Sequence, residues 1–117
     1  MTNYKNKTII GLVEKIELYN KKGSMTLLAR IDTGATKSSI DARLAAELQL
    51  GPVIQRKLIK SAHGNKIRPI MEAKIRLARK IITSEFTIAD RNHMKYHVLI
   101  GQNILKQGYL IDPGKGK

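Results

Sequence analysis

The chain has 117 residues, 42% of them hydrophobic, which suits one domain with an aliphatic core. Lysine and arginine number 22 against 9 acidic residues, so the formal net charge of +13 favours anionic partners such as acidic peptides or nucleic acid. The lack of cysteine excludes a disulfide framework and a thiolate metal site, and no apolar run approaches the roughly 20 residues that cross a bilayer. These properties predict a cytoplasmic protein without a membrane partner.

The first predicted elements are two strands that form a hairpin. A strand is predicted from Thr8 to Tyr19, where apolar residues nearly alternate from Leu12 onward, with a bulge or bend near Gly11. Residues 20–24, Asn-Lys-Lys-Gly-Ser, have the composition of a turn. The chain then returns as a strand over residues 25–31.

A helix is predicted after this hairpin. Residues 40–48 contain three alanines, two leucines and Glu47, and Gly51 followed by Pro52 would end the helix. Ser38 or Ser39 would cap its first turn. This is the one clear helical pattern in the sequence.

Strand patterns dominate the second half of the chain. A short turn at 63–65, which contains a glycine, would join two of the strands, and residues 90–93 have the composition of a loop. A short turn or helix is expected over 103–107. The predicted strands cover residues 53–62, 66–77, 81–89, 98–100 and 109–111. The pattern as a whole indicates one mostly β domain over residues 1–113, followed by a flexible tail over 114–117.

The strand that ends at Ile31 is followed directly by Asp32, Thr33 and Gly34. A carboxylate at the edge of the core would be held rigidly there, because it is followed by a hydroxyl group and by a glycine that permits a tight turn. Such a carboxylate can serve in acid–base catalysis. The same three residue types also form ordinary turns, so the motif alone leaves both interpretations open.

Longer segments around this motif resemble a known family. Residues 29–40, ARIDTGATKSSI, resemble the active-site loop of retropepsin-like aspartic peptidases, and residues 98–105, VLIGQNIL, resemble the strand, glycine and short helix that support this loop. A predicted hairpin at 61–66 lies where these enzymes carry a flap. Residues 38–42 and the ending LIDP at 110–113 are similar to a prokaryotic branch labelled putative ATP-dependent zinc protease, which is associated in some genomes with ATP-grasp ligases that add glutamates to ribosomal protein.

The resemblance implies a closed acid-protease barrel with one or two short helices, assembled as a homodimer. Asp32 would be the catalytic residue, supplied once by each subunit, and the enzyme would hydrolyse peptide bonds. Acidic peptides or proteins would be its substrates, and nucleic acid is a further possible partner. The other expected site residues are the loop support Thr33, Gly34 and Ala35, the flap Ala62, His63, Gly64 and Asn65, and Ile100 and Gly101 beneath the active site.

Two features depart from the family pattern. Gln102 stands where retroviral members commonly carry arginine, so the ion pair that such an arginine could make is not available. The zinc and ATP of the family label have no matching motif, because the chain has neither a glycine-rich phosphate loop nor a His-Glu-x-x-His element. His93 and His97 lie in a loop-to-strand segment, where a spacing of four does not bring side chains together. We therefore expect no metal and no cofactor.

Two other functions fit the sequence. The first is a catalytically inactive binding module that uses its positive charge to hold RNA, a ribosomal component or a ligase, although the few aromatic residues are scattered. The second is a metallopeptidase, for which the chain offers no evident set of ligands. A peptidase activity that Asp32→Asn abolishes and that chelation leaves intact would separate the aspartic peptidase from both alternatives.

Overall fold

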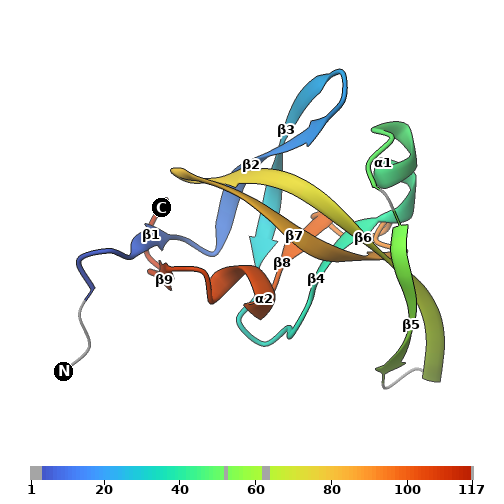
Figure 1. The fold of residues 1–117 in the computed structure, drawn as a ribbon. Helices are drawn as coiled ribbons and strands as arrows, with labels where there is room; N and C mark the ends of the chain where they lie inside the picture. The colour runs from blue at the N-terminus through green and yellow to red at the C-terminus, as the bar shows by residue number, and fades with distance from the viewer. Residues whose placement is uncertain (1–3, 52, 62–63, 117) are drawn as a thin grey trace.

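The computed structural model describes residues 4–51, 53–61 and 64–116. Within these ranges the chain forms nine strands and two short helices (Figure 1). Neither of the two described helices is long and apolar enough to span a membrane. The strands are β1 Thr8–Ile10, β2 Val13–Asn20, β3 Gly23–Ile31, β4 Ser38–Asp41, β5 Val53–Ser61, β6 Gly64–Leu77, β7 Lys80–Ala89, β8 Val98–Ile100 and β9 Tyr109–Ile111, and the helices are α1 Ala42–Glu47 and α2 Gln102–Leu105.

Six strands form a closed barrel. They are arranged in the order β2, β3, β8, β4, β7 and β6, and pairing between β2 and β6 closes the ring. Alternate side chains of these strands point inward, as Ile16 and Leu18 of β2 and Ile75 and Leu77 of β6 do with at most 1% exposure. Burial of each such side chain contributes about 1.5–3 kcal/mol relative to an exposed one. The predicted mostly β barrel with short helices is confirmed.

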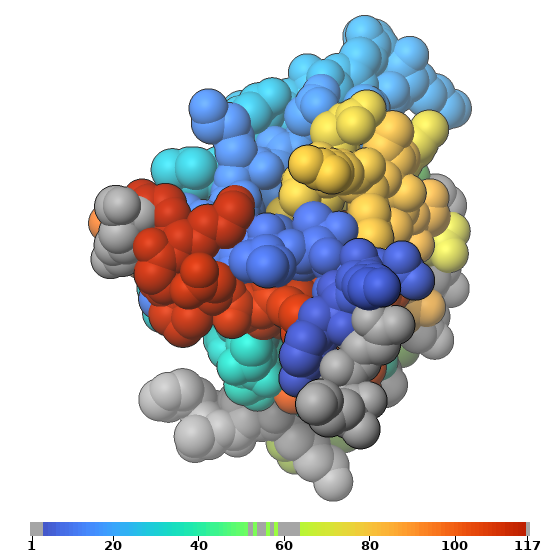
Figure 2. Space-filling view, turned by 90° about the vertical axis from the view of Figure 1, so that its left-hand side faces the viewer, coloured from blue at the N-terminus to red at the C-terminus, as the bar shows by residue number. Residues whose placement is uncertain are grey.

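A second, small sheet lies beside the barrel. Strand β1 pairs in parallel with β9, and Figure 2 shows the blue N-terminal and red C-terminal segments next to each other on one face. The chain bends at Gly11 before it enters β2, and a Cβ atom at Gly11 would lie 2.8 Å from the carbonyl oxygen of Lys115. The predicted bend near Gly11 is therefore the passage from one sheet to the other.

The predicted start of the helix is wrong. Ser38 and Ser39 lie in β4 and not at the N-cap that the sequence predicts. Helix α1 begins at Ala42, and Asp41 caps it by accepting a hydrogen bond from the Leu44 amide at 3.4 Å. Strand β4 is extended because it pairs with both β7 and β8, and this tertiary pairing outweighs the local helical preference.

Strands β5 and β6 pair with each other and form a hairpin that leaves the barrel (Figure 1). The inner part of β6 pairs with β2 and β7, whereas residues 64–69 pair only with β5 in the described part of the chain. Ala62 and His63 of the predicted turn lie outside the described residues. Gly64 and Asn65 are the first residues of β6.

Candidate active site

Asp32 follows the last residue of β3 and is half-buried. Its amide donates a hydrogen bond of 2.9 Å to the carbonyl oxygen of Ile100 in β8, which continues the parallel pairing of Ile31 with Ile100. Its carboxylate accepts a bond of 2.9 Å from the Gly34 amide, and its carbonyl oxygen accepts one of 3.3 Å from the Ala35 amide. The carboxylate is thus fixed by its own turn and by the neighbouring strand.

The loop after Asp32 lies on the start of α2. The carbonyl oxygen of Ala35 accepts a hydrogen bond of 2.8 Å from the Gln102 amide, and the carbonyl oxygen of Thr36 accepts one of 3.2 Å from the Asn103 amide. The side chain of Gln102 also donates to the carbonyl oxygen of Thr33 at 2.8 Å. Gln102 therefore holds the loop through a hydrogen bond of its neutral side chain, at the position where the sequence predicts that no ion pair can form.

Gly101 lets the loop approach β8 closely. A Cβ atom at this position would lie 2.8 Å from the carbonyl oxygen of Ala35 and would collide with the backbone of Lys37. These contacts are with backbone atoms, so the loop itself would have to move to make room. The predicted role of Gly101 beneath the active site has a direct steric basis.

Sequence reasoning missed two polar residues that support this loop. The buried hydroxyl of Ser38 accepts a hydrogen bond of 2.9 Å from the Gly101 amide and donates one of 2.7 Å to the side-chain oxygen of Asn103. The side-chain nitrogen of Asn103 donates at 2.9 Å to the carbonyl oxygen of Glu85. The available signal was the alternation in β4, which places Ser38 on the same inward face as Ile40.

Asp41 was also missed as a support of the site. It is only 2% exposed, and it accepts a hydrogen bond of 2.8 Å from the Arg91 amide as well as the capping bond from Leu44. Burial raises the pKa of this carboxyl, but hydrogen bonds from the backbone of Arg91, Leu44 and Arg43 outweigh this effect and hold the pKa below its ordinary value. Asp41 is therefore a buried anion that joins the end of β4 to the loop before β8.

The structure brings most of the predicted site residues together. The loop that starts at Asp32 lies against β8 and against Gly101, the residue that follows β8. Gly64 and Asn65 lie at the outer end of the hairpin. The residues brought together are Asp32, Thr33, Gly34, Ala35, Ile100 and Gly101.

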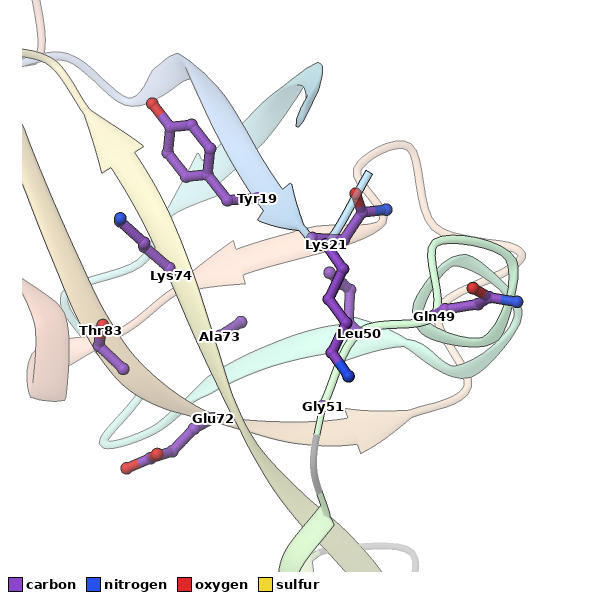
Figure 3. A pocket seen from close by; sticks show the side chains of 10 residues that line it. Tyr19, Lys21, Gln49, Leu50, Gly51, Glu72, Ala73, Lys74 and Thr83 are labelled. Atoms are coloured by element: carbon purple, nitrogen blue, oxygen red, sulfur yellow. The ribbon is translucent and has the colours of Figure 1, made fainter. Parts of the chain in front are cut away.

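A cavity of about 350 Å³ lies elsewhere, at the base of the hairpin (Figure 3). Its walls come from the end of β2, the connection between α1 and β5, and the middle of β6 and β7. Asp32 is not among its lining residues, which are Tyr19, Asn20, Lys21, Gln49, Leu50, Gly51, Glu72, Ala73, Lys74 and Thr83.

A six-stranded barrel whose Asp-Thr-Gly loop rests on a short strand and a short helix defines the retropepsin-like aspartic peptidase fold. The protease of simian foamy virus has this fold, with a TM-score of 0.57, 21% identity and coverage of 80% of this chain and 91% of the viral one. Protein Lpg0085 of Legionella pneumophila, described as having unknown function, gives a TM-score of 0.63 at 23% identity and covers 90% of this chain and 92% of its own. At these identities the likeness concerns the fold alone.

The family can be stated more narrowly. The family model described as RimB-like, retropepsin-like aspartic endopeptidase RimB, matches residues 46–117, which are more than half of the chain. The chain belongs to this family, and the predicted resemblance is confirmed. A protein described as a probable alpha-L-glutamate ligase, from Desulfotalea psychrophila, is 27% identical over 133 residues, which cover 92% of this chain and 28% of that relative. The chain thus spans less than a third of that relative's length.

Proposed function

We propose that the protein is an aspartic endopeptidase whose active site forms between two copies of the chain, with Asp32 of each copy facing the other. The observation that carries this proposal is the fixed position of the Asp32 carboxylate, which accepts the Gly34 amide at 2.9 Å on a loop braced by β8 and α2. The retropepsin-like family and fold support the same conclusion.

Two carboxylates are needed for the chemistry. One carboxylate removes a proton from a water molecule, which attacks the carbonyl carbon of the peptide bond, while the other carboxyl group donates a proton to the carbonyl oxygen. The tetrahedral intermediate then collapses as the amine leaves with a proton. Each chain supplies one Asp-Thr-Gly sequence, so a dimer with two-fold symmetry would supply the pair.

The small sheet offers an edge at which a second copy could join. Within the described residues β1 and β9 pair only with each other, so each strand has a second edge available for backbone hydrogen bonds. Ile9 in β1 is 53% exposed and would be covered by such pairing. This supports a dimer through the terminal strands.

Acidic peptides, including peptides that contain glutamate, are the proposed substrates. The net charge of +13 attracts them, and the exposed side chains of Arg30 and Lys37 lie within five residues of Asp32 along the chain. The relative whose printed name is a glutamate ligase points to the same chemistry. Cleavage of such peptides should therefore fall steeply with added salt, because salt screens long-range attraction; rates that are indifferent to salt would contradict this substrate preference.

The decisive experiment compares Asp32→Asn with Asp112→Asn. Asp112 has a matching turn, since its carboxylate accepts the Gly114 amide at 2.9 Å. Asp32→Asn should reduce cleavage of an acidic peptide by at least about a hundredfold, as expected for loss of a general acid–base group, and should leave the dimer mass in sedimentation unchanged. Asp112→Asn should remain active. Full activity of Asp32→Asn, or a monomer at concentrations where the wild type cleaves, would overturn the proposal.

The second candidate function is a binding module without peptidase activity. The charge of +13 is the observation that favours it. Such a module would bind RNA in a salt-dependent manner, Asp32→Asn would not change that binding, and the wild type would cleave no peptide.

A further inference from the structure

Strand β3 has one edge that is paired along only a short part of its length. On one side of the strand, β2 pairs with every residue from 23 to 30. On the other side, β8 pairs only with Arg30 and Ile31 in the described part of the chain. Residues 23–29 therefore have a second edge to which no described strand is bonded. We call this the open edge of β3.

Backbone groups of alternate residues point to the open edge. The Ile31 amide donates to the carbonyl oxygen of Leu12 on the β2 side at 2.9 Å, whereas the next amide along the chain donates to β8 at 2.9 Å. Because this direction alternates along a strand in an antiparallel pair, the backbone groups of Thr26 and Leu28 point away from β2. Unpaired groups of this kind can accept a further strand.

A groove of about 450 Å³ lies between β3 and a neighbouring loop. Leu27 and Leu28 of β3 form one wall, and residues 95–97, from the loop between β7 and β8, form the other. The loop is held by Arg91, whose Nε and Nη2 atoms donate to the carbonyl oxygen of Tyr96 at 3.2 and 3.1 Å. The groove thus has a braced loop on one side and the strand with the open edge on the other.

The side chains around the groove are apolar or cationic. Leu28 is 50% exposed, and Met94, which precedes Lys95 in the loop, is 54% exposed. Lys15 lies opposite Leu28 on β2, and Arg30 is the next residue on the same face of β3. Lys95 lines the groove from the loop. None of these three cations forms an ion pair with a carboxylate in the described part of the chain, so charge complementarity favours an acidic occupant that also carries apolar side chains.

We propose that the open edge of β3 is a docking site for a protein substrate, which binds there through an extended acidic segment that adds a strand to β3. The inference rests on the proposed function, because it assigns this segment to the substrate of the peptidase. Strand β3 ends directly before Asp32, and Leu28 precedes Asp32 by only four residues, about 13 Å along a strand. Backbone hydrogen bonds would supply affinity, and the flanking cations would select acidic sequences.

The first test measures whether a strand is added. A fluorescent peptide of five Glu-Val repeats is titrated with the full-length Asp32→Asn protein, alongside two versions methylated on the amide nitrogen of every glutamate or of every valine. Successive amides of a strand point to opposite sides, so only one of the methylated peptides loses its bonds to β3. That peptide should bind at least about tenfold more weakly, and the other should keep most of its affinity. An equal loss in both, or no loss in either, would overturn strand addition.

The second test locates the site on the protein. In the Asp32→Asn background, Leu28→Ala and Lys95→Glu should each weaken binding of the unmodified peptide by about fivefold or more. Ile81→Ala is the control for the apolar side chain, since Ile81 is 46% exposed on β7 and does not line the groove. Arg79→Glu is the control for charge reversal at an exposed position. Equal losses in the variants and their controls would overturn the site.

The third test connects docking with cleavage. Two substrates share one cleavable sequence, and one of them also carries the Glu-Val segment. Leu28→Ala should reduce the advantage of the extended substrate in kcat/KM by about fivefold, whereas Ile81→Ala should preserve it. An unchanged advantage in Leu28→Ala would overturn the docking site while leaving the proposed function intact.

The outcomes separate the two proposals and exclude another occupant. If the wild type cleaves neither substrate but Asp32→Asn binds the peptide in a manner that depends on Leu28 and Lys95, the proposed function fails and the groove stands as a site for acidic segments. Sedimentation of the wild type and of Leu28→Ala tests a second copy as the occupant. Loss of a wild-type dimer in Leu28→Ala would show that the open edge pairs with another copy of the chain, which would overturn the docking of substrate there.

Discussion

The loop around Asp32 and the outer part of the β5–β6 hairpin differ in how many elements hold them. The Asp32 loop is bonded to β8 and α2, and Ser38 and Asn103 connect this region to β7. The outer hairpin, residues 56–61 with 64–69, is held by the pairing of its own two strands in the described part of the chain. The comparison teaches that this fold holds Asp32 between several elements, whereas the outer hairpin extends from the barrel and is supported by one strand pairing (Figure 1).

This difference fits the proposed chemistry. An acid–base group must be placed to within a fraction of an ångström, whereas a flap that closes over a bound peptide must open to release it. The hairpin carries exposed apolar side chains, with Leu58 at 52% and Ile67 at 70%, on opposed positions of β5 and β6. Contact with an extended peptide would bury such side chains.

The largest combined effect on stability and catalysis is expected from adding one methyl group under the loop. Gly101→Ala should lower the free energy of unfolding by about 1–3 kcal/mol, because the methyl group meets backbone atoms of Ala35 and Lys37. Displacement of Asp32 by about an ångström should also reduce kcat/KM about a hundredfold. Chemical denaturation and a peptide assay measure both effects. Gly114→Ala is the control, since the nearest contact of its Cβ is 3.4 Å; wild-type behaviour of Gly101→Ala would contradict the rigid loop.

The next effect concerns the buried anion Asp41. Asp41→Asn should lower the free energy of unfolding at neutral pH by about 1–3 kcal/mol, because backbone donors lose a charged acceptor. Since the folded-state pKa is lowered, this stabilisation is present above the ordinary value of 3.8 and disappears as the pH falls through the lower folded value. Denaturation at several pH values should show the two proteins converging below about pH 4. Asp90→Asn, at an exposed site in the loop after β7 that Asp41 contacts, should change little; a constant difference at all pH values would contradict the ionised state of Asp41.

A smaller effect is expected where β9 joins the barrel. The hydroxyl of Tyr109 donates to the carbonyl oxygen of Leu77 at 3.0 Å, so Tyr109→Phe should cost about 1 kcal/mol. Burial raises the pKa of Tyr109 to about 12. The stabilisation by the neutral phenol is therefore complete below pH 10 and is lost as the pH rises towards about 12. Absorbance at high pH should show a late tyrosine titration step from Tyr109, and this step should be absent from Tyr109→Phe.

The smallest effect on stability tests the hairpin directly. Ile67→Ala should change the free energy of unfolding by less than about 0.5 kcal/mol, because the side chain is exposed. Ile75→Ala in the inner part of the same strand should cost about 2–5 kcal/mol, because Ile75 is fully buried. If the hairpin covers the substrate, Ile67→Ala should raise KM in the peptide assay. Equal destabilisation by the two changes would remove the distinction between the outer and inner parts of β6.

The fold class, most strands and the position of Asp32 could be predicted, because alternation and the Asp-Thr-Gly sequence are local signals. The helix start could not be predicted, because β4 is extended only through its pairing with β7 and β8. The supports of the site join distant parts of the chain: Ser38 bonds to a residue 65 positions away, and Asp41 to one 50 positions away. Such contacts form only when the barrel closes. The residue types next to Ser38, Asp41 and Arg91 in the sequence therefore do not predict these hydrogen bonds.

The parallel pair of β1 and β9 has a practical consequence for experiments on this protein. Because these strands lie side by side and run parallel, a fluorescent tag or purification handle placed before β1 and one placed after β9 would leave the same small sheet at its opposite ends. A large fused domain at either end would therefore lie close to the edge proposed for dimer formation and would weaken assembly. The turn at Lys21 and Lys22, between β2 and β3, is exposed and offers an insertion point away from that edge.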